Sequence, residues 1–182
     1  MTEQVIIVDS MDRPKGFMPK MDAHLNGGVL HRALSVFIIN PDGELLLQRR
    51  ALGKYHFGGL WSNTCCTHPR PGESTLRAAR RRLFEEMGIV CRLEPSFIFE
   101  YAAHCESGLT EREVDHVFSG CYSGKVMPNA AEVMDTRWIP LDALLDQVAD
   151  EPSLFTPWLR LALPRYVDFA DSSLNATAIS AR

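Results

Sequence analysis

The sequence predicts a mixed α+β domain in which helices flank a mixed β-sheet as α/β/α layers. Short β-branched and apolar runs occur on both sides of one strongly amphipathic helix, and further helices are expected only toward the C-terminal end. The chain has 182 residues, of which 46% are hydrophobic, so it is long enough for one well-filled core and short for two. We therefore expect one domain over residues 1–171 and a disordered tail over 172–182.

The first strands are predicted from apolar runs separated by turn residues. Residues 5–8 favour a short strand, and the acidic, Pro and Gly residues of 9–16 favour a turn that closes a hairpin. Residues 33–40 and 44–48 favour two further strands, because the Pro-Asp-Gly sequence between them is typical of a tight turn. We expect these two strands to pair with each other.

The most regular pattern is a helix over residues 74–87. Its apolar residues recur at intervals of three and four, and Gly88 is a typical C-terminal stop. A short helix is expected at 141–148, and a last helix at 156–170 should be kinked or broken by Pro164. Residues 58–62 favour a tight bend into another strand, and further strands are expected at 97–101, 114–121 and 137–139.

Charge and composition exclude several classes of partner. The net charge of −4 gives no general attraction to nucleic acid, and no apolar run approaches the roughly 18 residues of a membrane span. The first residues lack a signal-peptide pattern, and five cysteines, an odd number, favour free thiols over a disulfide framework. We expect a cytoplasmic protein with no nucleic-acid or membrane partner, present as a monomer or weak homodimer.

Residues 67–89 carry an ordered pattern of acids around the predicted helix. Seven residues separate Glu73 from the sequence Arg81-Arg82-Leu-Phe-Glu85-Glu86, and Gly88 follows. This pattern resembles the signature of the Nudix family, with Thr67 in place of its opening glycine and Arg82 in place of a glutamate. The resemblance implies the Nudix fold, a mixed β-sheet flanked by helices.

Arg82 also bears on the chemistry that the resemblance implies. In Nudix hydrolases the carboxylates of this segment hold Mg²⁺ ions that activate water. An arginine at one of these positions would repel such an ion by about 4 kcal/mol at a separation of about 4 Å and an effective dielectric of about 20. We therefore expect the fold to be kept and hydrolysis to be lost.

Three further elements, in the order found here, resemble the type I isopentenyl-diphosphate isomerases within the Nudix family. They are a pair of upstream histidines, an Asn-x-x-Cys-x-His-Pro sequence at 63–69 and a Glu-x-Glu pair at 111–113. The matching residues are His24, His31, Cys66, His68, Glu111 and Glu113. The resemblance covers residues 20–158, and it implies that Cys66, rather than Cys65, is the reactive thiol.

The same resemblance implies a metal site made of three histidines and two glutamates. Alternate residues of a strand face the same way, so Glu111 and Glu113 can reach one ion. Such a ligand set suits Mn²⁺, Mg²⁺ or Zn²⁺ in roughly octahedral coordination. The proposed ligands are His24, His31, His68, Glu111 and Glu113. The other histidines, His56, His104 and His116, match no part of the family pattern and are expected to be structural or surface residues.

A structural zinc site is the alternative use of the cysteines. It would draw on Cys65, Cys66, His68 and Cys105. Adjacent cysteines chelate one tetrahedral ion poorly, and the sequence has no second Cys-x-x-Cys pair, so this alternative is disfavoured.

The implied reaction converts isopentenyl diphosphate to dimethylallyl diphosphate through a tertiary carbocation. It needs two acid–base groups on opposite faces of the substrate, and the resemblance assigns these to Cys66 and Glu113. Tyr101 matches a tyrosine that assists protonation on the glutamate side. Trp158 matches the aromatic residue that faces the cation, a contact worth about 2 kcal/mol when desolvated. Trp61 is a second candidate for this wall.

The diphosphate requires cations of its own. The family's basic positions correspond to Lys20, Arg50, Lys54 and Arg82, and a Mg²⁺ ion held by Glu86 and the phosphate oxygens would add to the neutralisation. A Nudix hydrolase and an inactive metabolite-binding Nudix module are the competing functions. Arg82 disfavours the hydrolase, and the opposed acid–base pair disfavours the inactive module.

Overall fold

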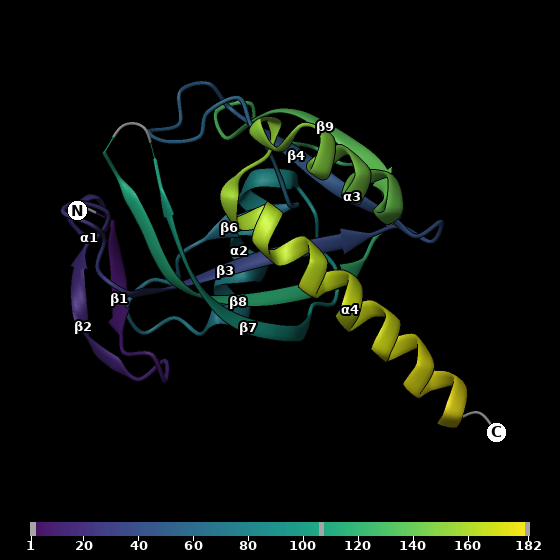
Figure 1. Ribbon diagram of the computed structural model, residues 1–182, viewed down its shortest axis with the longest axis horizontal. Helices are drawn as coiled ribbons and strands as arrows, with labels where there is room; N and C mark the ends of the chain where they lie inside the picture. Colours follow the sequence, from purple (N-terminus) through teal and green to yellow (C-terminus); the bar gives the residue numbers. More distant parts are fainter. Residues whose placement is uncertain (1–2, 106–107, 181–182) are drawn as a thin grey trace.

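The computed structural model describes residues 3–105 and 108–180, with side chains as far as residue 172. Within these residues one sheet of nine strands has helices on both faces, which confirms the predicted layers (Figure 1). The strands are β1 (Gln4–Val8), β2 (Pro14–Pro19), β3 (His31–Ile39), β4 (Glu44–Arg50), β5 (Trp61–Ser62), β6 (Cys65–Thr67), β7 (Glu94–His104), β8 (Thr110–Cys121) and β9 (Val133–Pro140). The helices are α1 (Lys20–Ala23), α2 (Thr75–Met87), α3 (Leu141–Asp150), the 3-10 turn η1 (Pro152–Leu154) and α4 (Pro157–Ser180).

β3 occupies the centre of the sheet and pairs with strands from four other parts of the chain. It runs parallel to β8, with His31 opposite Glu113, and antiparallel to β6, with Ser35 opposite Cys66. β1 and β4 pair with its two ends, and β1 and β2 form the predicted hairpin. The parallel pairing brings the first residues of β3 and β8 to the same end of the sheet.

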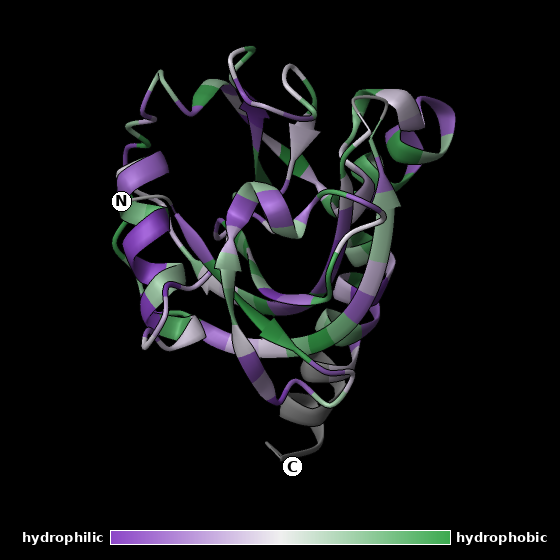
Figure 2. Ribbon diagram, turned by 90° about the vertical axis from the view of Figure 1, so that its left-hand side faces the viewer, coloured by the Kyte–Doolittle hydropathy of each residue, from purple (hydrophilic) through white to green (hydrophobic). Residues whose placement is uncertain are grey.

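Alternate residues of β3 build the two halves of the core. Leu34 and Ile38 face α2 and pack with Leu83, whereas Phe37 faces the opposite layer. There Phe37 stacks on Tyr166 of α4, with ring centroids 4.5 Å apart. Figure 2 shows that the hydrophobic stretches, in green, are carried by the strands between the helical layers.

The predicted helix at 74–87 is confirmed as α2. Ser74 is its N-cap, because the Ser74 hydroxyl accepts a hydrogen bond from the backbone N–H of Arg77 at 3.3 Å. Gly88 ends the helix in the left-handed conformation that favours glycine. The helix at 141–148 is confirmed as α3, which is slightly longer.

β8 begins at Thr110, earlier than the start at 114 that the apolar pattern predicts, and it includes the Glu-x-Glu pair that the family resemblance places in a strand. Residues 110–113 include buried polar side chains, among them those of Glu111 and Glu113, so this stretch lacks the apolar pattern of a strand. It is nevertheless paired throughout with β7, where Tyr101 lies opposite Glu113. None of the described helices is long and apolar enough to cross a bilayer.

Of the two outcomes expected at Pro164, the break does not occur, because α4 continues through this residue to Ser180, and the kink stays a prediction. Pro164 has no N–H to donate to the carbonyl of Arg160, four residues earlier. In the same turn the Arg165 guanidinium donates to the carbonyl of Leu161 at 2.6 Å. The backbone of residues 172–180 is helical where the sequence predicts a disordered tail, since neither Gly nor Pro follows Pro164 to stop it. Residues 181–182 lie outside the described part, and the domain limits stay a prediction.

Gly88 generates a prediction about stability. Its φ is 67°, and a Cβ at this position would lie 2.9 Å from the carbonyl oxygen of Met127. We expect Gly88→Ala to lower the free energy of unfolding by about 2–3 kcal/mol in urea denaturation, from left-handed strain together with this clash. Gly72→Ala is the control, because Gly72 has a φ of 78° but no atom within 4 Å of its Cβ position. It should lose only about 1–2 kcal/mol, the strain alone. Equal losses in the two variants would contradict a role for the Met127 contact.

Candidate active site

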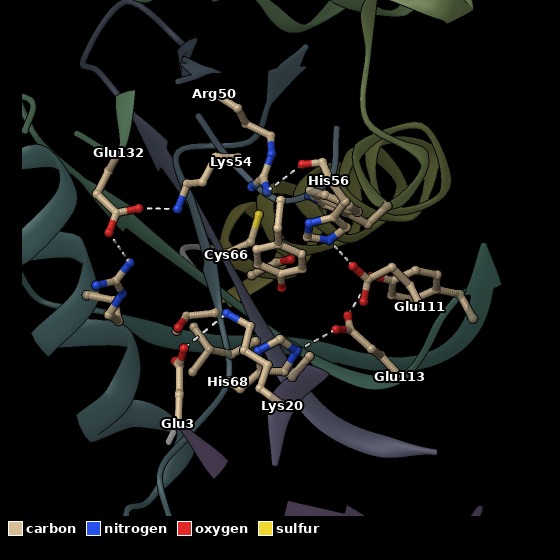
Figure 3. Close-up of a pocket in the computed structure, with 18 of the residues that line it drawn as sticks. Glu3, Lys20, Arg50, Lys54, His56, Cys66, His68, Glu111, Glu113 and Glu132 are labelled. Carbon is tan, nitrogen blue, oxygen red and sulfur yellow. Dashed lines mark hydrogen bonds and ion pairs between the residues drawn. The ribbon is translucent and has the colours of Figure 1, made fainter. Parts of the chain in front are cut away.

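A cavity of about 340 Å³ opens at the end of the sheet where β3 and β8 begin. Its walls come from distant parts of the chain: the N-terminal segment and α1, the loop over 50–57, β6, α2, the β7–β8 pair and the first turn of α4. Figure 3 shows the side chains of these segments converging on one space. The volume is in the range of small-ligand sites.

A buried cluster of possible metal ligands lies at this end of the sheet. One ligand atom from each residue lies within 4.8 Å of all the others, and every side chain is buried. The members of this metal cluster are His24, His31, His68, Glu111 and Glu113, the five residues predicted to share an ion. With bonds of about 2.1 Å to a central ion, opposite ligands would lie about 4.2 Å apart, so the spacing suits one divalent cation.

The orientation of the histidine rings supports this fit. The Nδ1 atoms of His24 and His31 donate to the carbonyls of Lys20 and Val29, at 2.6 and 2.7 Å. The Nε2 atom of each ring therefore faces the cluster, where it can present a lone pair to an ion or a hydrogen to a neighbouring glutamate. Nε2 of His31 also lies 3.1 Å from Nε2 of His68, a contact that a cation between the two nitrogens would stabilise. Burial lowers the pKa of His68 to about 4, which keeps its ring neutral and able to bind metal.

The two glutamates stay ionised in spite of their burial. Burial alone would raise the pKa of Glu113, but hydrogen bonds with His31 and His68 hold it well below its usual range. The Tyr101 hydroxyl donates to Oε2 of Glu113. Burial and the charge of Glu113 oppose ionisation of Glu111, but hydrogen bonds with His24 and His56 lower its pKa.

The two neighbouring thiols point to opposite faces of β6. Cys66 lines the cavity, whereas Cys65 is fully buried in the core beside α2. They cannot share one zinc ion, so the alternative site is excluded. No cysteine in the described part of the chain forms a disulfide. Burial raises the pKa of Cys66 to about 12, so the thiol is protonated, and its Sγ donates to Oδ1 of Asn63 at 3.0 Å.

Trp158 lies in the cavity wall close to the thiol. Its Nε1 donates to the Ser62 hydroxyl at 2.8 Å, and the same hydroxyl is 3.5 Å from Sγ of Cys66. The guanidinium of Arg50 lies over the Trp158 ring, 5.1 Å from its centroid. Trp61, the second candidate for this wall, does not line the cavity; its ring packs under the guanidinium of Arg137, 4.5 Å from the centroid.

The predicted phosphate-binding cations all line the cavity. This cation ring consists of Lys20, Arg50, Lys54 and Arg82. Lys20 pairs with Glu3 at 3.3 Å, and Lys54 and Arg82 both pair with Glu132. Among the described residues, the Nε atoms of Arg50 and Arg82 are buried without a hydrogen-bond partner.

Glu86 is the predicted metal ligand that lies apart from the others. Its side chain is buried next to Arg82, whose guanidinium donates to Oε1 of Glu86. The Gln48 amide donates to Oε2 at 3.2 Å. Both oxygens are thus engaged by protein donors, and Glu86 is absent from the described cavity wall.

Several cavity residues were missed by sequence reasoning. His56, expected to be a structural residue, contacts Glu111 in the cavity wall, and Glu3 and Glu132 are the counter-ions of the cation ring. None of the three has a local signal in the sequence: each lies in a loop or terminal segment whose direction only the fold decides. His104 and His116 lie outside the cluster, where they bond Thr110 and Asp12.

Comparison with known proteins finds a family match and close relatives. The model of the NUDIX domain family matches residues 29–159. The Isopentenyl-diphosphate Delta-isomerase of Burkholderia multivorans is 52% identical over 165 residues, covering 91% of this chain and 93% of that protein. The Isopentenyl-diphosphate Delta-isomerase 2 of Aromatoleum aromaticum is 47% identical over 182 residues, covering 100% of this chain and 95% of that protein.

Solved structures support the fold. The crystal structure of DR0079 from Deinococcus radiodurans superposes with a TM-score of 0.75 at 19% identity, covering 90% of this chain and 98% of that chain. The MutT protein from Methanosarcina mazei superposes with a TM-score of 0.65 at 20% identity, covering 79% and 95%. At these identities the likeness concerns the arrangement of helices and strands alone.

The metal cluster generates a prediction about ion binding. Alanine at His24, His31, His68 or Glu111 removes one donor from a shared ion. Each variant should bind Mn²⁺ at least about tenfold more weakly, since loss of an outer hydrogen-bond partner already costs that much. Metal analysis after gel filtration measures the content, and His104→Ala, outside the cluster, is the control. Full metal content in all four variants would refute a shared ion.

Proposed function

This chain belongs to the isopentenyl-diphosphate Delta-isomerases of the NUDIX domain family, and we propose that its cavity converts isopentenyl diphosphate to dimethylallyl diphosphate by proton transfer at two carbons. The product feeds isoprenoid biosynthesis. The cavity volume of about 340 Å³ suits a small substrate. The cytoplasmic location and the monomeric or weakly dimeric state stay predictions.

The proposal is carried by two proton-exchanging groups that face one cavity from two sides. Cys66 comes from β6 and Glu113 from β8, the strands on either side of β3. Moving the double bond requires one proton to be added at the terminal carbon and another to be removed two carbons away. The reaction is reversible, so each group acts as an acid in one direction and as a base in the other.

Tyr101 and Trp158 support the two ends of this reaction. The Tyr101 hydroxyl donates to Glu113 and keeps that carboxyl directed toward the cavity. Trp158 presents its ring to the tertiary carbocation between the two proton transfers, a contact worth about 2 kcal/mol where water is excluded. The bond from its indole N–H to Ser62 fixes the ring beside Cys66.

The metal cluster would hold Mn²⁺, with Mg²⁺ or Zn²⁺ as the other ions that its ligands suit. A bound ion would keep the Glu113 carboxyl in place and favour its ionised form. This chain's contribution is the orientation of the ligands, since backbone carbonyls fix the His24 and His31 rings and Tyr101 fixes Glu113.

The cation ring binds the diphosphate. Phosphate oxygens would accept charge-assisted hydrogen bonds from the ammonium and guanidinium groups that line the cavity. Mg²⁺ would accompany the diphosphate, and Glu86 could join it only after Arg82 releases its carboxylate, because both oxygens of Glu86 are bonded. Arg82 also neutralises the acids that a Nudix hydrolase would use for its metal, which supports proton transfer over phosphate cleavage.

The overall reaction is tested by incubating the protein with isopentenyl diphosphate, Mn²⁺ and Mg²⁺ in deuterated water. We expect proton NMR to show dimethylallyl diphosphate with deuterium incorporated, because acid–base groups exchange with solvent between turnovers. Phosphorus NMR should show no inorganic phosphate. Phosphate release without isomer would instead support a hydrolase.

The role of the thiol is tested by a matched pair of neighbours. Cys66→Ala should lower kcat at least about 10³-fold, because one of the two proton-exchanging groups is lost. Cys65→Ala removes a thiol of the same strand that faces the core and should keep most of the activity. Activity that depends on Cys65 and survives the loss of Cys66 would refute the assignment.

A further inference from the structure

His56 reaches into the metal cluster from a loop that is distant in sequence. Its Nε2 contacts Oε1 of Glu111, 55 residues away, while Nε2 of His24 lies 2.8 Å from Oε2. A carboxylate oxygen accepts hydrogen bonds, so Nε2 of His56 carries the hydrogen in its contact. The donation from His56 fixes Oε1 of Glu111 from a loop on another wall of the cavity, which restrains rotation of the carboxylate (Figure 3).

The packing around His56 fixes the direction of its ring. The ring is 7% exposed and stacks on Tyr55, with centroids 4.1 Å apart. Phe57, the next residue, has a φ of 50°, a left-handed backbone that is uncommon for a bulky side chain. The ring of Phe57 lies edge-on to Trp158, 5.4 Å away. A strained backbone held by packing on both sides is typical of a segment whose geometry serves a site.

The same loop carries part of the cation ring. Lys54 lies two residues before His56, and Nη2 of Arg50 donates to the His56 carbonyl at 3.2 Å. Two backbone hydrogen bonds of 2.9 Å close the loop at its base. The N–H of Arg50 donates to the carbonyl of Leu60, and the N–H of Gly59 donates to the carbonyl of Arg50. The contact with Glu111 joins this loop to β8, on another wall of the cavity.

We propose that His56 is a positioning residue for the metal cluster: it holds Oε1 of Glu111 and thereby ties the loop that carries Lys54 to the ion. This role rests on the metal cluster of the proposed function and adds a sixth residue outside the five ligands. Outer hydrogen-bond partners of ligating groups fix the ligand's orientation, and their loss weakens metal binding by about 10–100-fold.

The first test measures Mn²⁺ affinity without substrate, by calorimetric titration of the metal-free protein. His56→Ala should bind Mn²⁺ about 10–100-fold more weakly than the unchanged chain. His56→Gln, whose amide can reach the position of Nε2, should stay close to the unchanged affinity, whereas His56→Asn is too short and should resemble His56→Ala. The control is His116→Ala, because His116 also bonds a carboxylate, that of Asp12, outside the cluster. It should leave the affinity unchanged.

Two outcomes would overturn the proposal. One is unchanged Mn²⁺ affinity in His56→Ala, and the other is a His56→Gln variant as weak as His56→Asn, which would assign the effect to ring packing. If His56→Ala fails to fold, as judged by circular dichroism, the Gln and Asn variants decide between these results. Absence of Mn²⁺ binding by the unchanged chain would instead refute the metal cluster, so the two failures are distinguishable.

The second test measures the link between the ion and the loop. In hydrogen–deuterium exchange, Mn²⁺ should slow the amide exchange of residues 51–59 in the unchanged chain, because the ion fixes Glu111 and Glu111 holds His56. At saturating Mn²⁺, His56→Ala should lose this protection in 51–59 while keeping it around Glu111. Equal protection of the loop in both proteins would refute the link.

Discussion

Two carboxylates buried side by side on β8 impose the strongest constraint on this structure. Glu111 is 3% exposed and Glu113 6%, and a buried charge without partners costs several kcal/mol. Imidazoles from the N-terminal segment, from β3 and from His68, which directly follows β6, provide the compensating hydrogen bonds together with the Tyr101 hydroxyl. The position of these segments around the start of β8 is therefore a condition of stability as well as of chemistry.

Arg82 shows how one side chain changes the use of a shared helix. α2 lies between its Ser74 N-cap and Gly88, and its Arg82 bonds Glu86 and also faces the cavity. In the proposed function, Arg82 makes a surface that would suit metal suit phosphate instead. The proposed proton-transfer groups, Cys66 and Glu113, lie on strands of the sheet. The proposal therefore separates diphosphate binding from proton transfer at carbon within one cavity.

The sequence was sufficient for features that depend on local pattern or on a family motif. The period of α2, its Gly88 stop and the five residues of the metal cluster were all predicted, because spacing or family pattern identifies them. The apolar pattern did not predict the start of β8, which only the Glu-x-Glu motif indicated, and nothing in the sequence predicted the contact of His56. Buried polar residues lack the apolar alternation that indicates a strand. The direction of a loop side chain depends on tertiary packing. The break expected at Pro164 is absent for a related reason: the packing of α4 outweighs the loss of one helical hydrogen bond.

The long sequence separation of the contacting residues governs when the site can exist during synthesis. His24 and Glu111 are 87 residues apart, and Ser62 and Trp158 are 96 apart. Pairs so distant close only after the chain between them has been made, and domains generally fold as units. A ribosome-bound chain that has exposed the N-terminal hairpin and β3 holds two imidazoles of the metal cluster, those of His24 and His31, but neither carboxylate. A complete ligand set for an ion is therefore present only after β8 emerges, and the aromatic wall closes last of all.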